Sequence, residues 1–246
     1  MPVVGSIGAQ KGRRARWVWV LPVALGVVGG AVFLAVPEID LRVASAFYSP
    51  EGGFVGLRLG WVRALRQVFI YLYFGTIALC FAGLILTWRR RPQWLQLGRR
   101  HWLFLAACLA AGPGLVANLV FKDQWGRARP RHVAEFGGSK TFTPALLRAD
   151  QCRRNCSFVS GEAASSYVVF YAGAVVLPQW SVALVAVGTV AGLASGLIRM
   201  AQGAHFLSDV VFAGVFMALT VLLIERLMLR DRGRPRVPTP PPPAAV

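Results

Sequence analysis

Charged side chains are scarce in this chain. Of its 246 residues only 15% are charged, only 10 are Asp or Glu, and 56% are hydrophobic. A soluble domain of this length carries more charge over its surface. The composition therefore excludes an ordinary soluble protein and indicates an integral membrane protein.

Acidic residues are so few that the net charge is +17. Strongly basic proteins often bind nucleic acid, but here the Lys and Arg residues stand between long apolar runs instead of gathering on one polar domain. We therefore expect the lipid bilayer and an anionic lipid or substrate as partners, and no nucleic acid.

Potential metal ligands are also rare. The chain has 3 His and 4 Cys, and no His stands near the Cys152-Arg-Arg-Asn-Cys156 loop, so we do not expect a zinc site. The apolar runs lack the paired acidic residues that a magnesium site needs, and we expect no metal or other cofactor. Cys80 and Cys108 fall inside apolar runs. Cys152 and Cys156 would form a disulfide if their loop faces an oxidising compartment, although spacing alone does not establish that bond.

Six apolar runs have about the length of a membrane-spanning helix, which is roughly 20 residues. We predict an all-α polytopic membrane protein, with one six-helix domain over residues 17–227 and a helical or loop segment between spans three and four. Residues 1–16 form a basic cytoplasmic tail, and residues 228–246 form a basic, Pro-rich tail expected to be disordered. The six predicted spans cover residues 17–37, 67–88, 101–121, 162–177, 181–200 and 204–227.

Two segments have features of their own. Residues 38–66 mix aromatic and basic side chains, and we expect a short amphipathic helix on the membrane surface there. The third span contains Gly112-Pro113-Gly114, which we expect to kink it or open it locally.

Six spans put both termini on one side of the membrane. The Lys and Arg total is 14 on that side and 13 on the other, because the loop after the third span is itself rich in cations. The positive-inside rule favours cytoplasmic termini if those outer cations have a function. We therefore predict a protein of a bacterial-type inner membrane whose larger polar loops face the periplasm.

Three polar clusters fall on that periplasmic side, at residues 122–130, 157–162 and 199–209. Their Arg side chains match phosphate oxygens bidentately, and Lys122 adds a point charge. Ser160 and Gly161 open a helix, whose first N–H groups favour an anion. His205 and Asp209 are four residues apart on a helix, so Asp209 can hold one ring nitrogen while the other acts as base or nucleophile.

The spacing of these residues resembles the signature of the type-2 phosphatidic acid phosphatase superfamily, K-x6-R-P, P-S-G-H and S-R-x5-H-x3-D. The resemblance implies that His205 is the nucleophile, forming a phosphohistidine, and that Asp209 orients it. It also implies a set of ligands for the phosphoryl group. These ligands are Lys122, Arg129, Ser160, the Gly161 amide and Arg199.

The chain departs from the signature at three positions. Val159 and Ile198 replace the Pro and the Ser of the motifs, which are minor changes. Glu162 stands where the family has a His that protonates the leaving group. Glu162 is therefore either the proton donor, protonated when substrate is bound, or only a residue that caps a helix. His132 is an alternative donor.

Two further residues have open roles. Asn118 lies one helical turn before Lys122, where it either orients that Lys or makes an interhelical hydrogen bond. Arg127 lies in the first cluster but does not match the signature, so its role stays open and an interfacial cation is one interpretation.

The predicted function is that of a metal-independent lipid phosphate phosphatase. Members of the family act on phosphatidate, phosphatidylglycerol phosphate, polyprenyl diphosphate and lipid A phosphates, and the cationic loop and the variant second motif favour lipid A or polyprenyl diphosphate. One alternative is a phosphotransferase between lipids. Another is a non-catalytic protein that binds or transports lipid phosphates, which the intact His205 and Asp209 disfavour. The sequence does not indicate an oligomeric state.

Overall fold

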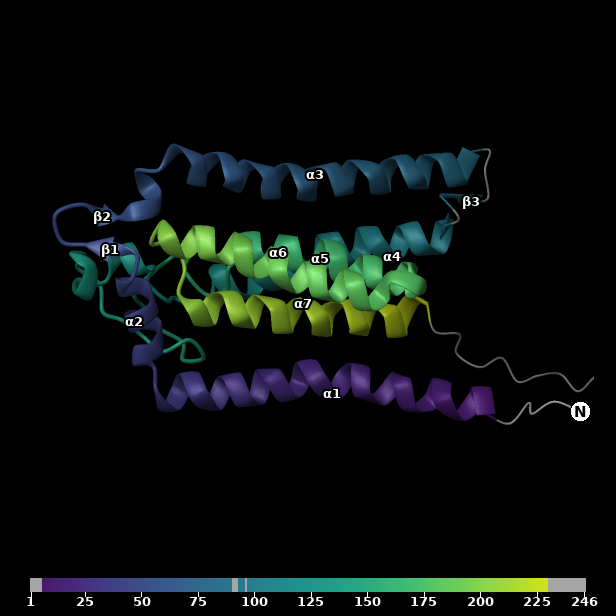
Figure 1. Cartoon of the computed structure of the whole chain (residues 1–246), viewed down its shortest axis with the longest axis horizontal. Coiled ribbons are helices and arrows are strands. Elements are labelled where there is room, and N and C mark those ends of the chain that lie inside the picture. Colours follow the sequence, from purple (N-terminus) through teal and green to yellow (C-terminus); the bar gives the residue numbers. More distant parts are fainter. Residues whose placement is uncertain (1–5, 90–92, 96, 230–246) are drawn as a thin grey trace, which may run out of the picture.

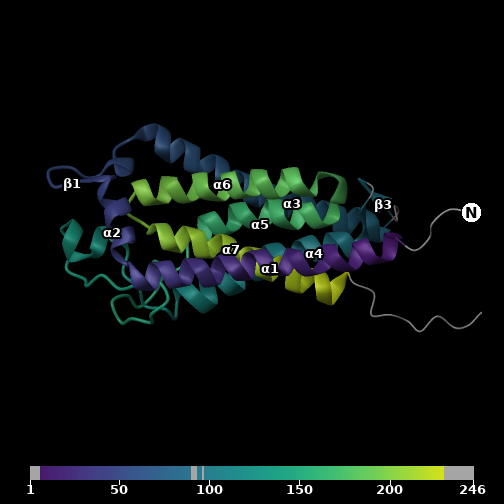
Figure 2. The same cartoon turned by 60° about the horizontal axis from the view of Figure 1, so that its bottom comes forward.

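The computed structural model describes residues 6–89, 93–95 and 97–229, and its long helices run side by side along one axis (Figures 1 and 2). This confirms the predicted all-α membrane architecture. The proline-rich tail lies outside the described residues. The long helices are α1 (Ser6–Ala35), α3 (Gly60–Arg89), α4 (Arg99–Leu109) with its continuation η2 (Ala110–Lys122), α5 (Gly161–Val176), α6 (Ser181–Ala201) and α7 (Leu207–Met228).

The described helices give fewer membrane spans than the six apolar runs of the sequence. Among the described residues, four helical stretches are long and apolar enough to cross a bilayer, or five if the pair Val20–Ala35 and Glu38–Ser45, bent by 84°, forms one span. Helix α5 has only 16 residues, although it packs against α6 and α7. The count of six therefore stays a prediction. The four stretches are Gly60–Trp88, Arg99–Lys122, Pro178–Ala201 and Leu207–Met228.

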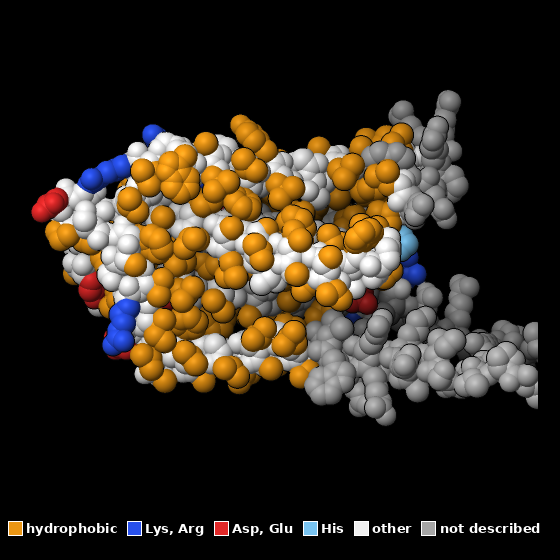
Figure 3. Space-filling view, viewed as in Figure 1, with side chains coloured by type: hydrophobic (Ala, Val, Ile, Leu, Met, Phe, Trp, Pro, Cys, Tyr) orange, Lys and Arg blue, Asp and Glu red, His pale blue; other side chains and the backbone are white. Residues whose placement is uncertain are grey.

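Apolar side chains cover the long faces of the bundle, and charged side chains stand mainly at its ends in the view of Figure 3. Tyr71 on α3 and Val182 and Val190 on α6 are 70%, 83% and 68% exposed. Such exposure is unfavourable in water and favourable against lipid acyl chains, where helices satisfy their own backbone groups. The protein is therefore a multi-pass membrane protein.

The third predicted span does not break at its Gly-Pro-Gly sequence. Helix α4 continues as the π-type helix η2, which contains Pro113 and ends at Lys122. Proline removes one helical N–H donor, and a wider helical turn accommodates that loss without ending the helix. At the position of the predicted local opening, the helix changes its pitch. The continued helix places Lys122 at the end of the bundle.

The segment before α3 contains the predicted short helix, although it is brief. Helix α2 (Glu38–Ser45) is followed by a hairpin of β1 (Tyr48–Ser49) and β2 (Gly53–Phe54), in which Tyr48 pairs with Phe54, and then by η1 (Val55–Leu57). Helix α3 then begins at Gly60, before the predicted start at residue 67. A second hairpin, β3 (Gln93–Trp94) with β4 (Leu97–Gly98), joins α3 to α4.

One end of the bundle gathers all three polar clusters. In Figure 1, α2, β1 and β2, the loop before α5 and the turn between α6 and α7 lie at this end, whereas β3, the start of α1 and the end of α7 lie at the other. Phe158 anchors the loop, because its buried ring packs on Phe121, Trp125 and Phe212 at centroid distances of 5.3, 5.3 and 5.8 Å. A rigid aromatic core therefore underlies the polar residues.

Candidate active site

His205 lies at the centre of the polar end, in the turn between α6 and α7, and its side chain is 2% exposed. Its Nδ1 is 2.7 Å from the backbone oxygen of Ser157, which can only accept a hydrogen bond, so Nδ1 carries the proton. Nε2 is then the unprotonated nitrogen with a lone pair. Burial lowers the pKa of His205 to about 4, although Asp209 acts in the opposite direction. The imidazole is therefore neutral at pH 7, as a nucleophile must be.

Asp209 lies beside His205 but does not bond to it directly. Its Oδ2 is 3.6 Å from His205 Nδ1, beyond hydrogen-bond range, and instead accepts bonds from the Ser157 hydroxyl and, at 2.8 Å, from the Phe206 N–H. Asp209 therefore holds Ser157 and Phe206, which flank the imidazole of His205. The Ser157 carbonyl fixes the tautomer of that imidazole.

Two predicted phosphate ligands come from the first cluster. Arg129 is buried and donates from Nε and Nη2 to the backbone oxygen of Asn155, and from Nη2 to the Asn155 side chain, at 3.1, 2.7 and 2.7 Å. Lys122 lies over the start of α5, because a Cβ added to Gly161 would come within 2.8 Å of its Nζ and 3.3 Å of Asn118 Oδ1. A side chain at position 161 would therefore displace the ammonium group.

The second and third clusters meet the first at the start of α5. Ser160 is fully buried, its backbone N–H donates to the Asp209 carbonyl at 3.1 Å, and its hydroxyl has no hydrogen-bond partner. Arg199, in the last turn of α6, contacts Gln202 through Nη1, while its buried Nε also lacks a hydrogen bond. Two unsatisfied buried groups beside a helix N-terminus form an arrangement suited to an anion.

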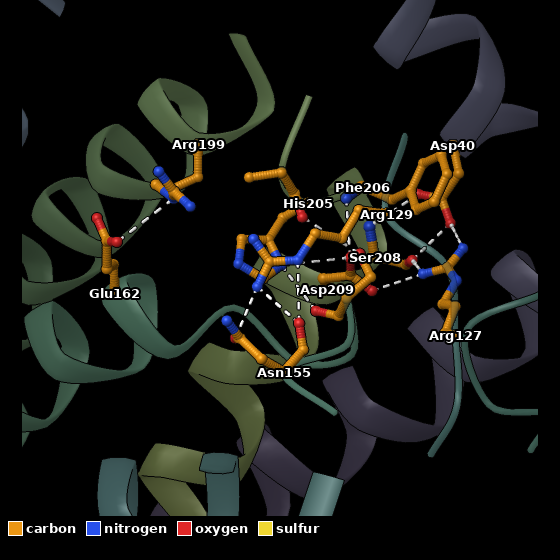
Figure 4. Close-up of polar contacts among 12 residues, drawn as sticks. Asp40, Arg127, Arg129, Asn155, Glu162, Arg199, His205, Phe206, Ser208 and Asp209 are labelled. Atoms are coloured by element: carbon orange, nitrogen blue, oxygen red, sulfur yellow. Dashed lines mark hydrogen bonds and ion pairs between the residues drawn. The ribbon is translucent and has the colours of Figure 1, made fainter. Parts of the chain in front are cut away.

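Glu162 faces the same region from the first turn of α5 (Figure 4). Arg66 of α3 holds its carboxylate with three donor contacts of 2.8 to 3.1 Å, and Arg199 Nε lies 3.5 Å away. A bidentate arginine stabilises the ionised form of a carboxylate. These contacts weigh against the predicted role of Glu162 as proton donor, which stays a prediction.

His132 is placed less favourably as an alternative donor. Its exposed side chain accepts a hydrogen bond from Arg131 Nε at 3.3 Å. Burial of part of the ring, with the charges of Arg131 and Arg129, lowers the pKa of His132. At neutral pH its imidazole is uncharged and is a weak proton donor.

Several residues of this region were not predicted from the sequence. Asp40, Arg66, Arg127, Asn155 and Ser157 make the contacts that hold the predicted residues in place. The scarcity of acidic residues was a usable signal for Asp40, because a charge beside a membrane span seldom lacks a partner. Arg127 is fully buried, which rules out the interfacial position that the sequence left open.

The remaining predictions concern cysteines and metals. Cys152 and Cys156 are joined by a disulfide, while Cys80 and Cys108 are buried free thiols. Within residues 6–89, 93–95 and 97–229, no group of three or more His, Cys, Asp or Glu side chains is placed to hold a metal ion.

The buried position of His205 predicts the pH at which its ring takes up a proton. Because its pKa is lowered to about 4, we expect its ring to stay neutral from pH 8 down to about 5 and to take up a proton only below that. Nitrogen NMR of labelled histidine in detergent micelles measures this, with His205→Gln identifying its signals among the 3 His. Protonation near the ordinary His pKa, at about 6.5, would contradict the buried environment described above.

Comparisons with known proteins agree with this geometry. A family model described as the PAP2 superfamily matches residues 101–234. The chain is 37% identical over 207 residues to a lipid A 4′-phosphatase of Francisella tularensis subsp. novicida (strain U112), covering 81% of this chain and 90% of the relative. A lipid A 4′-phosphatase of Rhizobium leguminosarum is 32% identical over 210 residues, covering 78% and 90%. A lipid A 1-phosphatase of Rhizobium etli (strain ATCC 51251 / DSM 11541 / JCM 21823 / NBRC 15573 / CFN 42) is 36% identical over 117 residues, 46% of each chain.

The family-model match covers the three motif clusters at the polar end of the bundle, residues 122–130, 157–162 and 199–209. All three relatives are named as phosphatases of lipid A. This chain belongs to the PAP2 superfamily and is a membrane-embedded lipid phosphatase.

Proposed function

We propose that this protein removes the 4′-phosphate of lipid A at the periplasmic face of a bacterial inner membrane, through a phosphohistidine on His205. The observation that carries the proposal is the buried, neutral His205 with one ring nitrogen fixed by the Ser157 carbonyl. The choice of lipid A over polyprenyl diphosphate rests on the 4′-phosphatase that matches 81% of the chain. The match to a lipid A 1-phosphatase covers only 46% of the chain.

In the first step the phosphate group occupies the anion site at the start of α5. Lys122, Arg129 and Arg199 neutralise its oxygens, and the Ser160 hydroxyl and the Gly161 N–H donate hydrogen bonds to them. His205 Nε2 attacks phosphorus, a nitrogen–phosphorus bond forms, and the bond from phosphorus to the sugar oxygen breaks. The sugar oxygen leaves with the bonding electron pair and takes up a proton.

In the second step water attacks the phosphohistidine. The nitrogen–phosphorus bond breaks, the electron pair returns to His205 Nε2, and inorganic phosphate leaves with the added oxygen. The Ser157 carbonyl keeps the Nδ1 proton in place through both steps, so Nε2 is regenerated as the nucleophile. Replacing this water by a second lipid alcohol would make the enzyme a phosphotransferase.

Glu162 has a different part in this proposal from the one the family signature gives its position. Its ion pairs with Arg66 and Arg199 hold Arg199 beside the anion site while no phosphate is bound. The side chains of Arg66 and Glu162 are 34% and 24% exposed, so water reaches this side of the site and can supply the proton for the leaving oxygen. Glu162 is then a positioning residue for Arg199.

The variant Glu162→Gln separates these two roles. We expect KM to rise about threefold to tenfold, with kcat changed less and with both limbs of the pH–rate profile retained, because an Arg199 contact is lost while no acid is removed. Arg66→Gln, which removes the other partner of Glu162, is expected to do the same. A general acid contributes about 10²- to 10⁴-fold. A kcat loss of that size, with KM unchanged, would show instead that Glu162 donates the proton.

The periplasmic placement of the site is supported by the Cys152–Cys156 disulfide, since such bonds persist in oxidising compartments. The half-buried Cys152 becomes a free thiol in Cys156→Ser, and we expect a membrane-impermeant maleimide to label it in intact cells whose outer membrane has been made permeable. Gln179→Cys, at an exposed position between α5 and α6 at the opposite end, is the matched control in a Cys152→Ser, Cys156→Ser background. Labelling of position 179 alone would show that the orientation in the membrane is the reverse of the one proposed.

The activity itself is tested with purified protein and a panel of single lipids in detergent. The panel contains lipid A, polyprenyl diphosphate, phosphatidate and phosphatidylglycerol phosphate, each with and without a chelator. We expect phosphate release to be fastest from lipid A and to persist in chelator. Release that requires a second, added lipid would support a phosphotransferase, and binding without release would support a transport protein.

A further inference from the structure

The side chain of Arg127 is fully buried and joins three parts of the chain. Its Nε donates to the Thr143 carbonyl at 2.8 Å, and its Nη1 donates to Ser208 Oγ and Asp209 Oδ1 of α7 at 2.9 and 2.6 Å. Its Nη2 donates to Asp40 Oδ2 of α2 at 2.7 Å. All the donor nitrogens of this guanidinium are therefore engaged by acceptors with fixed positions.

Asp40 is the second buried carboxylate of this group and is 1% exposed. Besides Arg127, its oxygens accept bonds from the Ser208 backbone N–H, at 2.9 Å, and from the Ser208 hydroxyl. Two buried carboxylates, Asp40 and Asp209, therefore share one buried guanidinium. Asp209 places its carboxylate 3.6 Å from His205, the residue that becomes more positive when its Nε2 is phosphorylated.

The contacts continue from Asp209 to the imidazole. Asp209 accepts bonds from the Ser157 hydroxyl and the Phe206 N–H, and the Ser157 carbonyl accepts the Nδ1–H of His205. A change in the position of Asp209 would therefore shift both neighbours that hold the ring. Figure 4 shows Asp40 and Arg127 on the side of His205 opposite to Arg199 and Glu162.

Asp40 lies on α2, far along the chain from the other residues of this group. Helix α2 turns 84° from the axis of α1 and lies across the end of the bundle, which brings Asp40 onto the first turn of α7. Residues 101–234, which match the family model, contain Arg127, His205 and Asp209 but not Asp40. An acidic group from outside the family-model match thus joins the charged centre.

We propose that Asp40 is a positioning residue of the active site, acting through Arg127 and Asp209 to hold His205 for attack and to offset the charge of its phosphorylated form. Asp40 does not touch His205 and is not itself catalytic. The inference rests on the proposed role of His205 as nucleophile.

The variant Asp40→Asn tests this, since it keeps the size of the side chain and removes its charge. We expect kcat for lipid A dephosphorylation to fall about tenfold, with KM within twofold of the wild type, because the anion site is unchanged. The rate of phosphoenzyme formation in a single turnover should fall by the same factor. Glu38→Gln, an exposed position on the same helix, is the matched control and should stay within twofold on every measure.

The possible results separate a positioning role from a structural one. Asp40→Asn with a lower melting temperature but an unchanged kcat would overturn the inference, and so would a rise in KM alone. If this variant does not fold, Ser208→Ala removes the hydroxyl that bonds both Asp40 and Arg127. It should lower kcat about threefold, and an unchanged kcat would overturn the inference in that case. Failure of the proposed function is recognised separately, because His205→Ala would then release phosphate like the wild type.

Discussion

His205→Ala is expected to lower phosphate release from lipid A by about 10⁴-fold or more, because it removes the nucleophile of the proposed covalent mechanism. The imidazole is buried and its Nδ1 donates to the Ser157 carbonyl, so Nε2 is held in one fixed position. The variant should also fail to form the covalent intermediate. With lipid labelled at phosphorus, the wild type should retain label that is stable in alkali and lost in acid, as expected of a phosphohistidine.

The control for this experiment is His132→Ala. His132 is exposed and contacts Arg131, and we expect its removal to leave phosphate release within about threefold of the wild type, as is usual for a surface substitution. Unchanged release in His205→Ala would contradict the mechanism. Loss of activity in His132→Ala, with the alkaline limb of the pH–rate profile removed, would identify His132 as the proton donor.

Arg127→Met is expected to have the largest effect on stability. It leaves Asp40 and Asp209, which are 1% and 0% exposed, without the positive charge between them. Removing one partner of a buried ion pair typically destabilises a protein by about 3–5 kcal/mol, and the fall in melting temperature should be on the order of 10 °C. Thermal unfolding of the purified protein in detergent measures this.

Two further variants test the cause of that loss. Adding Asp40→Asn to Arg127→Met removes one of the two buried carboxylate charges that have lost their cation. The double variant should therefore be more stable than Arg127→Met alone. Arg154→Met, which changes an exposed cation of the same loop, should stay within about 0.5 kcal/mol of the wild type. If Arg127→Met and Arg154→Met melt at the same temperature, the buried charges do not stabilise the fold.

The sequence was sufficient to predict the membrane class and the clustering of the motif residues. Long apolar runs fix the helices because only helices and closed barrels satisfy backbone groups in lipid. Alternation of the helix directions then brings the loops that contain Arg129, Ser160 and His205 to one end of the bundle, as Figure 1 shows. The spacing of charged residues in those loops carried the chemical information.

The support of the site could not be predicted in the same way. The bond between Asp40 and Arg127 joins residues 87 positions apart, and the Arg66–Glu162 pair joins residues 96 positions apart. Such pairs depend on how α2 and α3 lie against the rest of the bundle, which helical periodicity does not specify. For the same reason the predicted contact between Asp209 and His205 appears in the structure with Ser157 and Phe206 as intermediaries.

Glu162 illustrates how a motif position and its surroundings can differ. The signature places a proton donor at this position, and a Glu of raised pKa serves as an acid in other enzymes. Here Arg66, from a helix outside the motifs, forms an ion pair with the carboxylate. In the function proposed above, a single residue of α3 therefore changes the role of a residue of α5.

The position from which phosphate is lost tests whether this protein acts as a lipid A 4′-phosphatase. Purified protein is incubated with lipid A in chelator, and fragmentation mass spectrometry of the product locates the remaining phosphate, with His205→Ala run in parallel. We expect loss of one phosphate, from the 4′ position, by the wild type alone. Loss from the 1 position, or equal loss in His205→Ala, would contradict it.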